Sequence, residues 1–418
     1  MTIRNKQVWA WALYDAGNSA FATVVMAGFV PLLLKTCWSS SSDVTVSTAQ
    51  LGMANTVAGV FIALLAPLLG AIADCSTSRK KHLLLFTVLG AASTALLAVV
   101  PCGGWRTAIA CYCAASVGFS GALIFYDSLL PAIASSQEAH RVSSYGFALG
   151  YAGGGLIFAA CVAAAALADR GGYTTEQAVR ASFLMVGIWW LAFSVPLMLY
   201  VDEPAYRTDV RSPRLIRSGL AELLATLKQI RTRRQVWLFL LAYWLYIDGV
   251  DTVIKMALDY GISLGLSSGA LVGALLLTQC IAFPCALAFG ALGSRWGPHK
   301  AVIGGLGAYI VIVLWGMVIR HEWEFFVLAS MVGMVQGGVQ ALSRSIFANL
   351  IPKERSAEFF GLYNMVGKYA ALFGPAVLGI TARLTGNPRA GIASLLFFFI
   401  IGALLLSRVK LQPQGIPR

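Results

Sequence analysis

Twelve long apolar runs follow one another along this chain, and they constrain its fold more than any other feature. Each is about 18 to 27 residues long, which at ~1.5 Å per residue gives roughly 27 to 40 Å of helix. A bilayer's hydrocarbon core is about 30 Å thick, so each run can cross it with some tilt. The runs cover residues 9–34, 49–73, 83–101, 107–133, 144–168, 181–201, 236–258, 268–292, 301–319, 325–350, 359–382 and 390–407. We therefore expect an all-α membrane protein with twelve transmembrane helices.

The composition agrees with this class. Only 12% of the residues are charged and 58% are hydrophobic, whereas a soluble domain has roughly 25% charged residues. A transmembrane β-barrel would show alternating segments of about ten residues, and these runs do not alternate. The first run is too long for the apolar region of a cleaved signal peptide, so we expect it to remain as the first helix.

The net charge of +13 would fit a nucleic-acid-binding protein, but the positions of the basic residues argue against that class. With the N-terminus in the cytoplasm, 21 of the 31 Lys and Arg residues fall on the inner side and 7 on the outer side. This asymmetry follows the positive-inside rule. We expect two cytoplasmic termini and basic loops that face lipid headgroups rather than nucleic acid. Because no Asn-x-Ser/Thr sequon occurs, we expect a bacterial inner membrane.

The longest polar stretch, residues 202–235, divides the runs six and six. Short segments recur across it in the same order: "LYDAG" at 13–17 is similar to "LYIDG" at 245–249, and "GAIADCSTSRKKH" at 70–82 is similar to "GALGSRWGPHK" at 290–300. Two six-helix halves in the same orientation resemble the major facilitator superfamily, in which substrate binds at the midplane between halves. We expect pseudo-symmetric halves at residues 1–201 and 236–418, a cytoplasmic linker at 202–235, and a monomer.

Several ionisable residues lie inside the apolar runs. Charge is costly in lipid, so such residues are expected to face a polar interior. In the seventh run Asp248 and Asp251 share a helix face with Lys255, and Asp248 lies near mid-bilayer. Asp248 is therefore our first candidate for a proton-coupling group. The other candidates are Asp251, Asp15 and Asp127, and a purely structural ion cluster stays open as an alternative.

Polar and aromatic side chains on the same helices suggest a small-molecule site. Gln336, Gln340 and Arg344 form one stripe from the midplane to the inner end of the tenth run, and amides can bind donors or acceptors. Lys368 lies about halfway through the eleventh run and needs an anion. The candidate substrate-binding residues are Tyr14, Asn18, Tyr126, Tyr246, Gln336, Gln340, Asn364 and Lys368. Helix packing is the competing explanation for the stripe.

The loop after the second run carries Gly70, Asp74 and Arg79, and it resembles the superfamily's loop between helices 2 and 3. A glycine allows close helix approach, and a carboxylate there can pair with basic groups in one conformation and release them in another. The matching loop of the second half keeps Arg295. We expect these residues and Arg344 to act in gating, although a merely basic inner loop would give a similar pattern.

A closer resemblance emerges from five segments taken together. They are "WALYDAGNSAFATVV", "RVSSYGFALGYAGG", "FLLAYWLYIDGVDTVIKMA", "GMVQGGVQALSRSIFANLIP" and "EFFGLYNMVGKYAALFGP". Together they resemble the autophagy-related vacuolar-effluxer branch of the superfamily, whose fungal members are regarded as amino-acid exporters. The chain departs from that pattern at Ala16, Gly17, Asp127 and Ile247, so its substrate need not be the family's usual one.

The resemblance and the residues together predict a secondary active transporter for a small polar or zwitterionic, amino-acid-like solute, coupled to protons. A transporter of a larger amphipathic solute (drug, siderophore, peptide or nucleoside) and a non-transporting receptor are the alternatives. We expect no enzyme activity, because the four histidines fall in or beside loops. No cofactor or metal site is expected, since the cysteines lack ligand spacing; Cys37 and Cys102 can both face outside, which leaves a disulfide open.

The distribution of basic residues predicts the topology. Both termini and residues 202–235 should face the cytoplasm. Reporter fusions at the two termini and within 202–235 check this. A reporter that places the 202–235 segment outside would overturn the twelve-helix arrangement.

Overall fold

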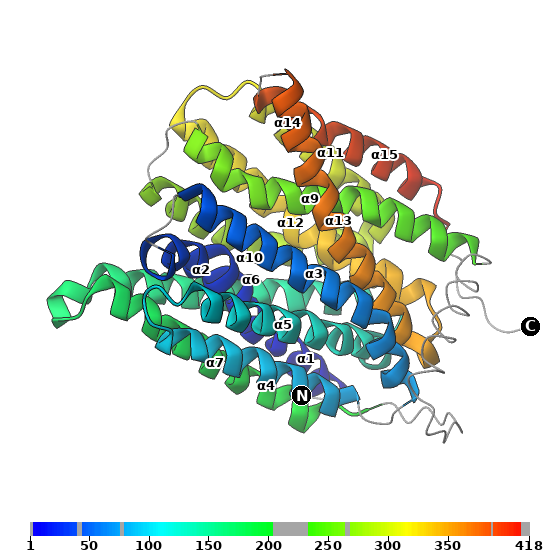
Figure 1. Cartoon of the computed structure of the whole chain (residues 1–418). Coiled ribbons are helices and arrows are strands. Elements are labelled where there is room, and N and C mark those ends of the chain that lie inside the picture. Colours follow the sequence, from blue (N-terminus) through cyan, green and yellow to red (C-terminus); the bar gives the residue numbers. More distant parts are fainter. Residues whose placement is uncertain are drawn as a thin grey trace, which may run out of the picture.

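The computed structural model describes residues 3–39, 44–75, 79–203, 233–263, 268–385 and 388–410, and Figure 1 shows them as a bundle of long helices. Most of the predicted linker and the side chains of Asp74, Lys255 and Lys368 lie outside this description. The helices before residue 204 form what we call the N-terminal half. They are α1 (Ile3–Ala20), η1 (Phe21–Phe29), α2 (Val30–Leu33), η2 (Leu34–Trp38), α3 (Val44–Cys75), α4 (Arg79–Leu96), η3 (Leu97–Val99), α5 (Trp105–Ile133), α6 (Ala139–Ala166), η4 (Ala168–Gly171) and α7 (Thr175–Tyr200).

The helices after residue 232 form the C-terminal half. They are α9 (Arg234–Ser263), α10 (Ser268–Trp296), α11 (Pro298–Gly316), α12 (Glu322–Leu350), η5 (Lys353–Arg355), α13 (Ser356–Thr385), α14 (Pro388–Ala393) and α15 (Leu395–Ser407). We call the end of the bundle where α1, α9 and α13 begin the predicted inner end, because the basic residues gather there. The opposite end is the predicted outer end.

Ten helices in the described part of the chain are long and apolar enough to cross a membrane. Helices α3 and α13, with 32 and 30 residues, lie at the positions of the two other predicted runs. The all-α membrane class is therefore confirmed. The full count of twelve, the pseudo-symmetry of the halves and their exact boundaries stay predictions.

Local sequence explains where several helices begin. The N–H of Gln177 donates to the Thr174 hydroxyl over 3.2 Å, and the N–H of Thr174 donates to the Gln177 side chain over 2.9 Å, which is a capping box at the start of α7. Helix α11 begins at Pro298 after Gly297, whose φ of +87° few other residues adopt.

The first membrane segment is not a plain α-helix. It passes from α1 into the π-helical turns of η1 and, after α2, of η2. A π turn is rare and usually occurs singly, frequently at functional sites. The sequence predicted an uninterrupted helix here, and the wider turns of η1 include the β-branched run Thr23-Val24-Val25.

Two pairs of helices make the most extensive contacts between the halves, and α6 with α12 and α5 with α13 add smaller ones. Helix α3 packs against α13, which Figure 1 shows as neighbouring strips of blue and orange, and α6 packs against α10. Gly70 allows the first contact: a Cβ atom there would collide with the Ala357 carbonyl oxygen and lie 2.7 Å from Glu358 Cα. The predicted close approach at Gly70 therefore lies between the halves.

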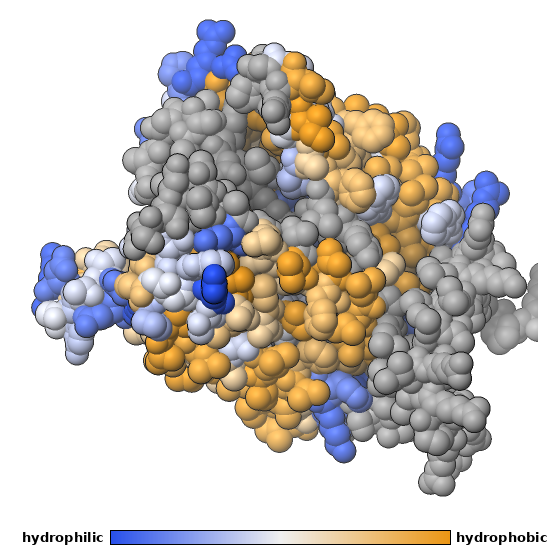
Figure 2. Space-filling view, in the orientation of Figure 1, coloured by the Kyte–Doolittle hydropathy of each residue, from blue (hydrophilic) through white to orange (hydrophobic). Residues whose placement is uncertain are grey.

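The surface agrees with a lipid environment. Large apolar side chains are exposed on many helices, among them Leu64, Leu85, Ile188, Leu199 and Leu404. Figure 2 shows apolar atoms over most of the visible helix surfaces and hydrophilic atoms mainly at the ends of the bundle. A soluble monomer rarely exposes such wide apolar patches.

The Gly70 contact yields a test with a matched control on the same helix. Gly70→Ala should destabilise the protein by about 1–3 kcal/mol, because the extra methyl group meets backbone atoms that cannot move aside. Gly59→Ala should have little effect, since nothing lies within 4 Å of its Cβ position. Thermal unfolding of the two purified variants compares them; equal unfolding temperatures would contradict the packing described here.

Candidate functional site

A buried ion cluster joins the two halves at the predicted inner end. Arg344 of α12 is 3% exposed. Its Nη1 atom lies 3.1 Å from an Asp127 carboxylate oxygen of α5 and 3.6 Å from an Asp15 carboxylate oxygen of α1. The same guanidinium donates to the hydroxyl and the carbonyl of Ser143 in α6, each over 2.9 Å. One cation of the C-terminal half thus holds three helices of the N-terminal half.

Aromatic rings cover the cluster. The guanidinium carbon of Arg344 lies 4.8 Å from the Trp11 ring centre and 4.4 Å from that of Phe147. Trp11 stacks on Tyr126 at 4.4 Å, and the Tyr126 hydroxyl donates to Asp15 over 3.3 Å. The rings exclude water, which strengthens every electrostatic interaction among the groups they cover.

Gly146 of α6 supplies the room for this arrangement. A Cβ atom there would lie 2.9 Å from both Arg344 Nη2 and the Tyr126 hydroxyl oxygen, and 3.0 Å from Asp15 Oδ2. A side chain at this position would displace the charged groups from one another.

Helix α13 also reaches the cluster. The Asn364 amide donates to Asp127 Oδ2 over 3.3 Å and to the Phe360 carbonyl over 3.0 Å. The structure therefore brings together five residues that the sequence analysis assigned to three separate roles: Asp15, Asp127, Tyr126, Arg344 and Asn364.

Other predicted substrate residues lie elsewhere. The Tyr14 hydroxyl pairs with the Thr87 hydroxyl at 2.8 Å, inside the N-terminal half. Asn18 is 2% exposed, and its Oδ1 atom accepts no hydrogen bond in the described structure. The Tyr246 hydroxyl pairs with Ser343 at 2.7 Å, inside the C-terminal half.

Asp248 binds the backbone of α13. Its Oδ1 atom accepts a hydrogen bond from the Gly374 N–H over 2.8 Å, and a Cβ on Gly374 would lie 2.7 Å from the same oxygen. Gly374 precedes Pro375, which interrupts the hydrogen bonding of the helix. Asp251 is partly buried on the next turn of α9. The Lys368 side chain is outside the described part, so its role in substrate binding stays a prediction.

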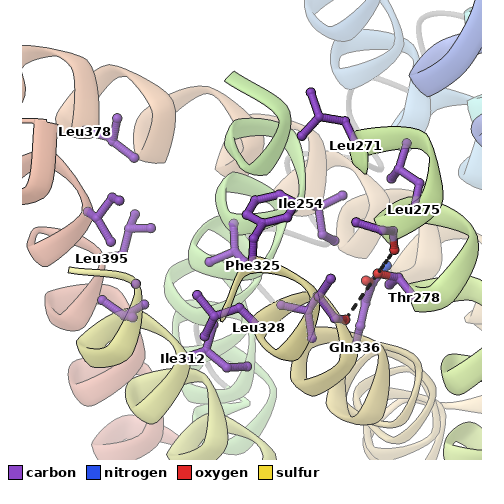
Figure 3. A pocket seen from close by; sticks show the side chains of 17 residues that line it. Ile254, Leu271, Leu275, Thr278, Ile312, Phe325, Leu328, Gln336, Leu378 and Leu395 are labelled. Atoms are coloured by element: carbon purple, nitrogen blue, oxygen red, sulfur yellow. Dashed lines mark hydrogen bonds between the residues drawn. The ribbon is translucent and has the colours of Figure 1, made fainter. Parts of the chain in front are cut away.

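Gln336 lies between an apolar cavity and the boundary between the two halves, which we call the seam. Its side chain lies near the Tyr151 side chain of α6. Gln340, one turn further in, is partly buried. Figure 3 shows the cavity, of about 130 Å³, inside the C-terminal half. Among the described residues that line it, Thr278 is the one polar group besides Gln336, and its hydroxyl lies 2.8 Å from the Ala274 carbonyl and 3.2 Å from that of Ala329.

A second layer of contacts closes the predicted inner end. Arg79, 5% exposed, donates to the Ser128 carbonyl over 3.3 Å and to the Ser356 hydroxyl over 2.9 Å. The Asn349 amide donates to the Ser136 carbonyl over 2.9 Å. Arg295, predicted to take part in gating, is exposed. Asp74 belongs to the side chains that the structure does not describe.

Sequence reasoning missed several members of the seam. Trp11, Ser143, Phe147 and Tyr151 were not proposed as site residues, although all lie in quoted motifs. The signal was available in α6, where Ser143, Phe147 and Tyr151 recur every four residues and so share one helix face.

Comparisons with known proteins agree on one family. The family described as "Vacuole effluxer Atg22 like" matches residues 44–414. An uncharacterized MFS-type transporter, YxiO of Bacillus subtilis, is 37% identical, with 97% of this chain and 95% of YxiO covered. Autophagy-related protein 22 of Yarrowia lipolytica is 27% identical over 65% of this chain and 49% of its own length.

The fold is also that of solved transporters. The human organic anion transporter MFSD10 superposes with a TM-score of 0.75, covering 96% of this chain and 99% of its own at 16% identity. The expectation that the chain is not an enzyme agrees with these relatives, which are named as transporters. The protein is a multi-pass membrane protein with the major facilitator fold, and it belongs to the Atg22-like vacuole-effluxer family.

Proposed function

We propose that this protein is a secondary active transporter that moves a small zwitterionic, amino-acid-like solute across the membrane by alternating access, coupled to protons. The observation that carries the proposal is the Arg344 cluster, which ties the two halves together at one end of the bundle. The family description as an effluxer supports transport as the activity.

The distribution of contacts supports a gate at this end. Most polar contacts between the halves in the described structure lie at the predicted inner end, through Arg344, Arg79, Asn349 and Ser143. Nearer mid-membrane are the Tyr151–Gln336 contact and a 3.0 Å hydrogen bond from Gln279 to Thr23. We infer that the inner gate is closed in this conformation, and that transport requires Arg344 to leave Asp15 and Asp127.

The charges of the gate suggest the class of solute. Separating a buried cation from its carboxylates leaves groups of both signs without partners, which is costly in a dry site. A zwitterion offers a carboxylate for Arg344 and an ammonium for Asp127, so it can replace both sides of the broken pair. A neutral sugar offers neither charge.

The same cluster suggests where a proton enters the cycle. Two carboxylates and one guanidinium carry one net negative charge when all are ionised, and an uncompensated buried charge is unfavourable. A proton on Asp15 or Asp127 removes it. Asp248, our first candidate from the sequence, contacts the backbone of α13 and would instead couple protonation to the Gly374-Pro375 interruption.

A second candidate function has one observation in its favour. The apolar cavity beside Gln336 could take the hydrocarbon part of a larger amphipathic solute. Uptake of amino acids, peptides, nucleosides and siderophores into proteoliposomes compares the two. Amino-acid flux supports the main proposal, flux of the larger compounds alone supports the alternative, and binding without flux would point to a receptor.

We further propose a bacterial inner membrane with both termini cytoplasmic. The Bacillus relative supports the source. The disulfide between Cys37 and Cys102 lies at the predicted outer end, and disulfides persist in oxidising compartments, which supports that end facing outward.

The gate predicts a change in accessibility. Arg344→Gln removes the cation and leaves two buried carboxylates, a loss that costs about 3–5 kcal/mol in other buried pairs. A cysteine placed at Ser128 should then react several times faster with an impermeant maleimide on the cytoplasmic side. Adding Asp127→Asn should reverse part of the effect. The control is Arg141→Gln, an exposed arginine at the same end; equal labelling in all variants would remove Arg344 from the gate.

Proton coupling predicts a separate phenotype. With Asp248 as the coupling group, the first candidate from the sequence, Asp248→Asn should abolish uphill transport while counterflow continues, because exchange needs no net proton movement. Asp169→Asn, an acidic residue of η4 outside the helices of the seam, is the control. If uphill flux in Asp248→Asn keeps its pH dependence, the proton is carried elsewhere, and the same assay applies to Asp127→Asn and Asp15→Asn.

A further inference from the structure

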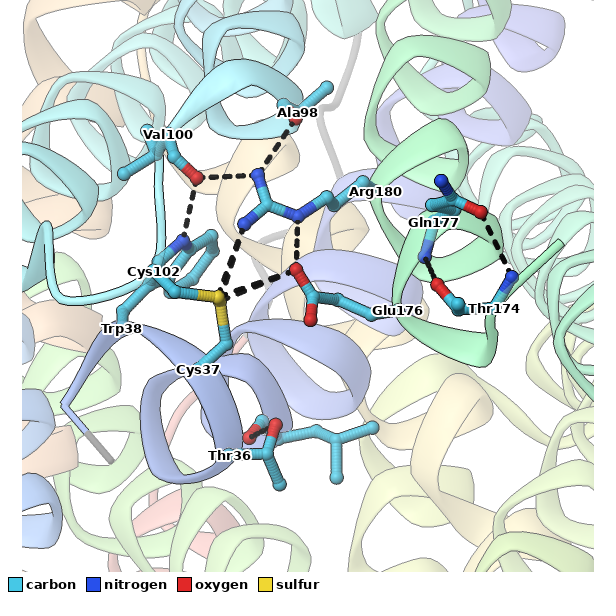
Figure 4. The surroundings of a disulfide bond; sticks show 11 residues. Thr36, Cys37, Trp38, Ala98, Val100, Cys102, Thr174, Glu176, Gln177 and Arg180 are labelled. Carbon is cyan, nitrogen blue, oxygen red and sulfur yellow. Dashed lines mark hydrogen bonds and ion pairs between the residues drawn. A yellow bond between two sulfur atoms is a disulfide. The ribbon is translucent and has the colours of Figure 1, made fainter. Parts of the chain in front are cut away.

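Figure 4 shows the surroundings of a disulfide. The bond lies at the predicted outer end, away from the Arg344 cluster. It joins Cys37 of η2 to Cys102 in the turn between η3 and α5, with the two Cα atoms 4.8 Å apart and 65 residues apart in sequence. The enclosed segment contains α3, the helix that packs against α13 of the other half. The bond therefore links the segments before and after α3, a helix that contacts the other half, at the predicted outer end.

The two sulfur atoms differ in access. Cys37 is 3% exposed, whereas Cys102 is exposed. In thiol–disulfide exchange the incoming thiolate attacks one sulfur and expels the other, and access decides which one is attacked. A thiol arriving from solution meets the Cys102 sulfur.

A cation lies beside the sulfur that would be expelled. Arg180 Nη2 is 3.2 Å from Cys37 Sγ and 3.7 Å from Cys102 Sγ. Hydrogen bonds to the carbonyls of Ala98 and Val100 hold the guanidinium in place, as Figure 4 shows. A positive neighbour stabilises a thiolate, so Cys37 is the better leaving group of the two.

A carboxylate completes the arrangement. Glu176 Oε1 lies 2.8 Å from Arg180 Nε, 3.4 Å from Cys102 Sγ and 3.6 Å from Cys37 Sγ. At these distances it can accept the hydrogen of either thiol once the bond is open. Arg180 can thus stabilise the thiolate when the disulfide is open, and Glu176 can accept a thiol hydrogen when the disulfide forms again.

We propose that this disulfide is a redox-active modification site, and that Cys102 is the residue on which low-molecular-weight thiols form a mixed disulfide. The thiolate of the incoming molecule bonds to Cys102 Sγ, the Cys37–Cys102 bond breaks, and its electron pair leaves with Cys37 as a thiolate beside Arg180. A second thiol molecule then attacks the mixed disulfide. It releases Cys102 as a thiolate and leaves with the first as an oxidised dimer, so two electrons pass to the protein.

The experiment identifies the attacked sulfur directly. The purified full-length protein is exposed briefly to 2-mercaptoethanesulfonate, quenched with iodoacetamide and analysed by peptide mass spectrometry. We expect the mixed disulfide on Cys102 and the alkyl group on Cys37. The reverse pattern, equal amounts on both residues, or reaction only after thermal unfolding would overturn the proposal.

Variants of Arg180 test the leaving-group effect. Arg180→Gln should slow the opening at least about fivefold, since the Cys37 thiolate loses its cation. Arg180→Lys should restore much of the rate, which separates the charge from a general folding defect. Arg170→Gln, another arginine of the predicted outer end, is the matched control and should react like the wild type. Unchanged kinetics in a folded Arg180→Gln would make the bond purely structural.

Discussion

The structure depends on one buried cation being shared by two carboxylates across the boundary between the two halves. Arg344 comes from one half, Asp15 and Asp127 from the other, and aromatic rings keep water away from all three. In such a site the attraction is strong, but either partner alone is strongly destabilising. In the transport cycle that we propose, the arrangement has two favourable conditions: fully paired, or supplied with replacement charges by the solute. A hydrophobic seam of the same area would hold the halves together equally well, but it would give no solute a way to exchange partners with it.

Sequence reasoning recovered the membrane class, the positions of the long helices and the family, because all three follow from features that repeat along the chain. Apolar runs are constrained by bilayer thickness, and family motifs are contiguous. It also found Asp15, Asp127 and Arg344 individually, since charge within an apolar run stands out. It could not pair them: Arg344 is 217 residues from Asp127, and no local pattern encodes which distant helix faces another.

Other features had weak or no sequence signal. The sequence shows a glycine at position 146, but only its neighbours in the folded protein explain why a side chain is excluded there. The predicted positions of Cys37 and Cys102 allowed a disulfide without requiring it. Arg180 and Glu176, which lie beside the bond, come from a helix more than 70 residues further along and could not be predicted. The π-helical turns of the first segment had no recognisable signature. In each case the information lies in contacts between segments that are remote in sequence.

Many hydrogen bonds at the predicted inner end are accepted by main-chain oxygens. Ser143 donates to the Ala341 carbonyl, Asn349 to that of Ser136, and Arg79 and Ser356 both to that of Ser128. Every residue has a backbone carbonyl, so the residue that accepts the hydrogen bond can be substituted as long as its backbone stays in place. Correlated substitution between paired positions should consequently be faint at these contacts and concentrated on Arg344 with its carboxylates. Methods that infer helix neighbours from covariation would then detect this boundary chiefly through its single charged cluster.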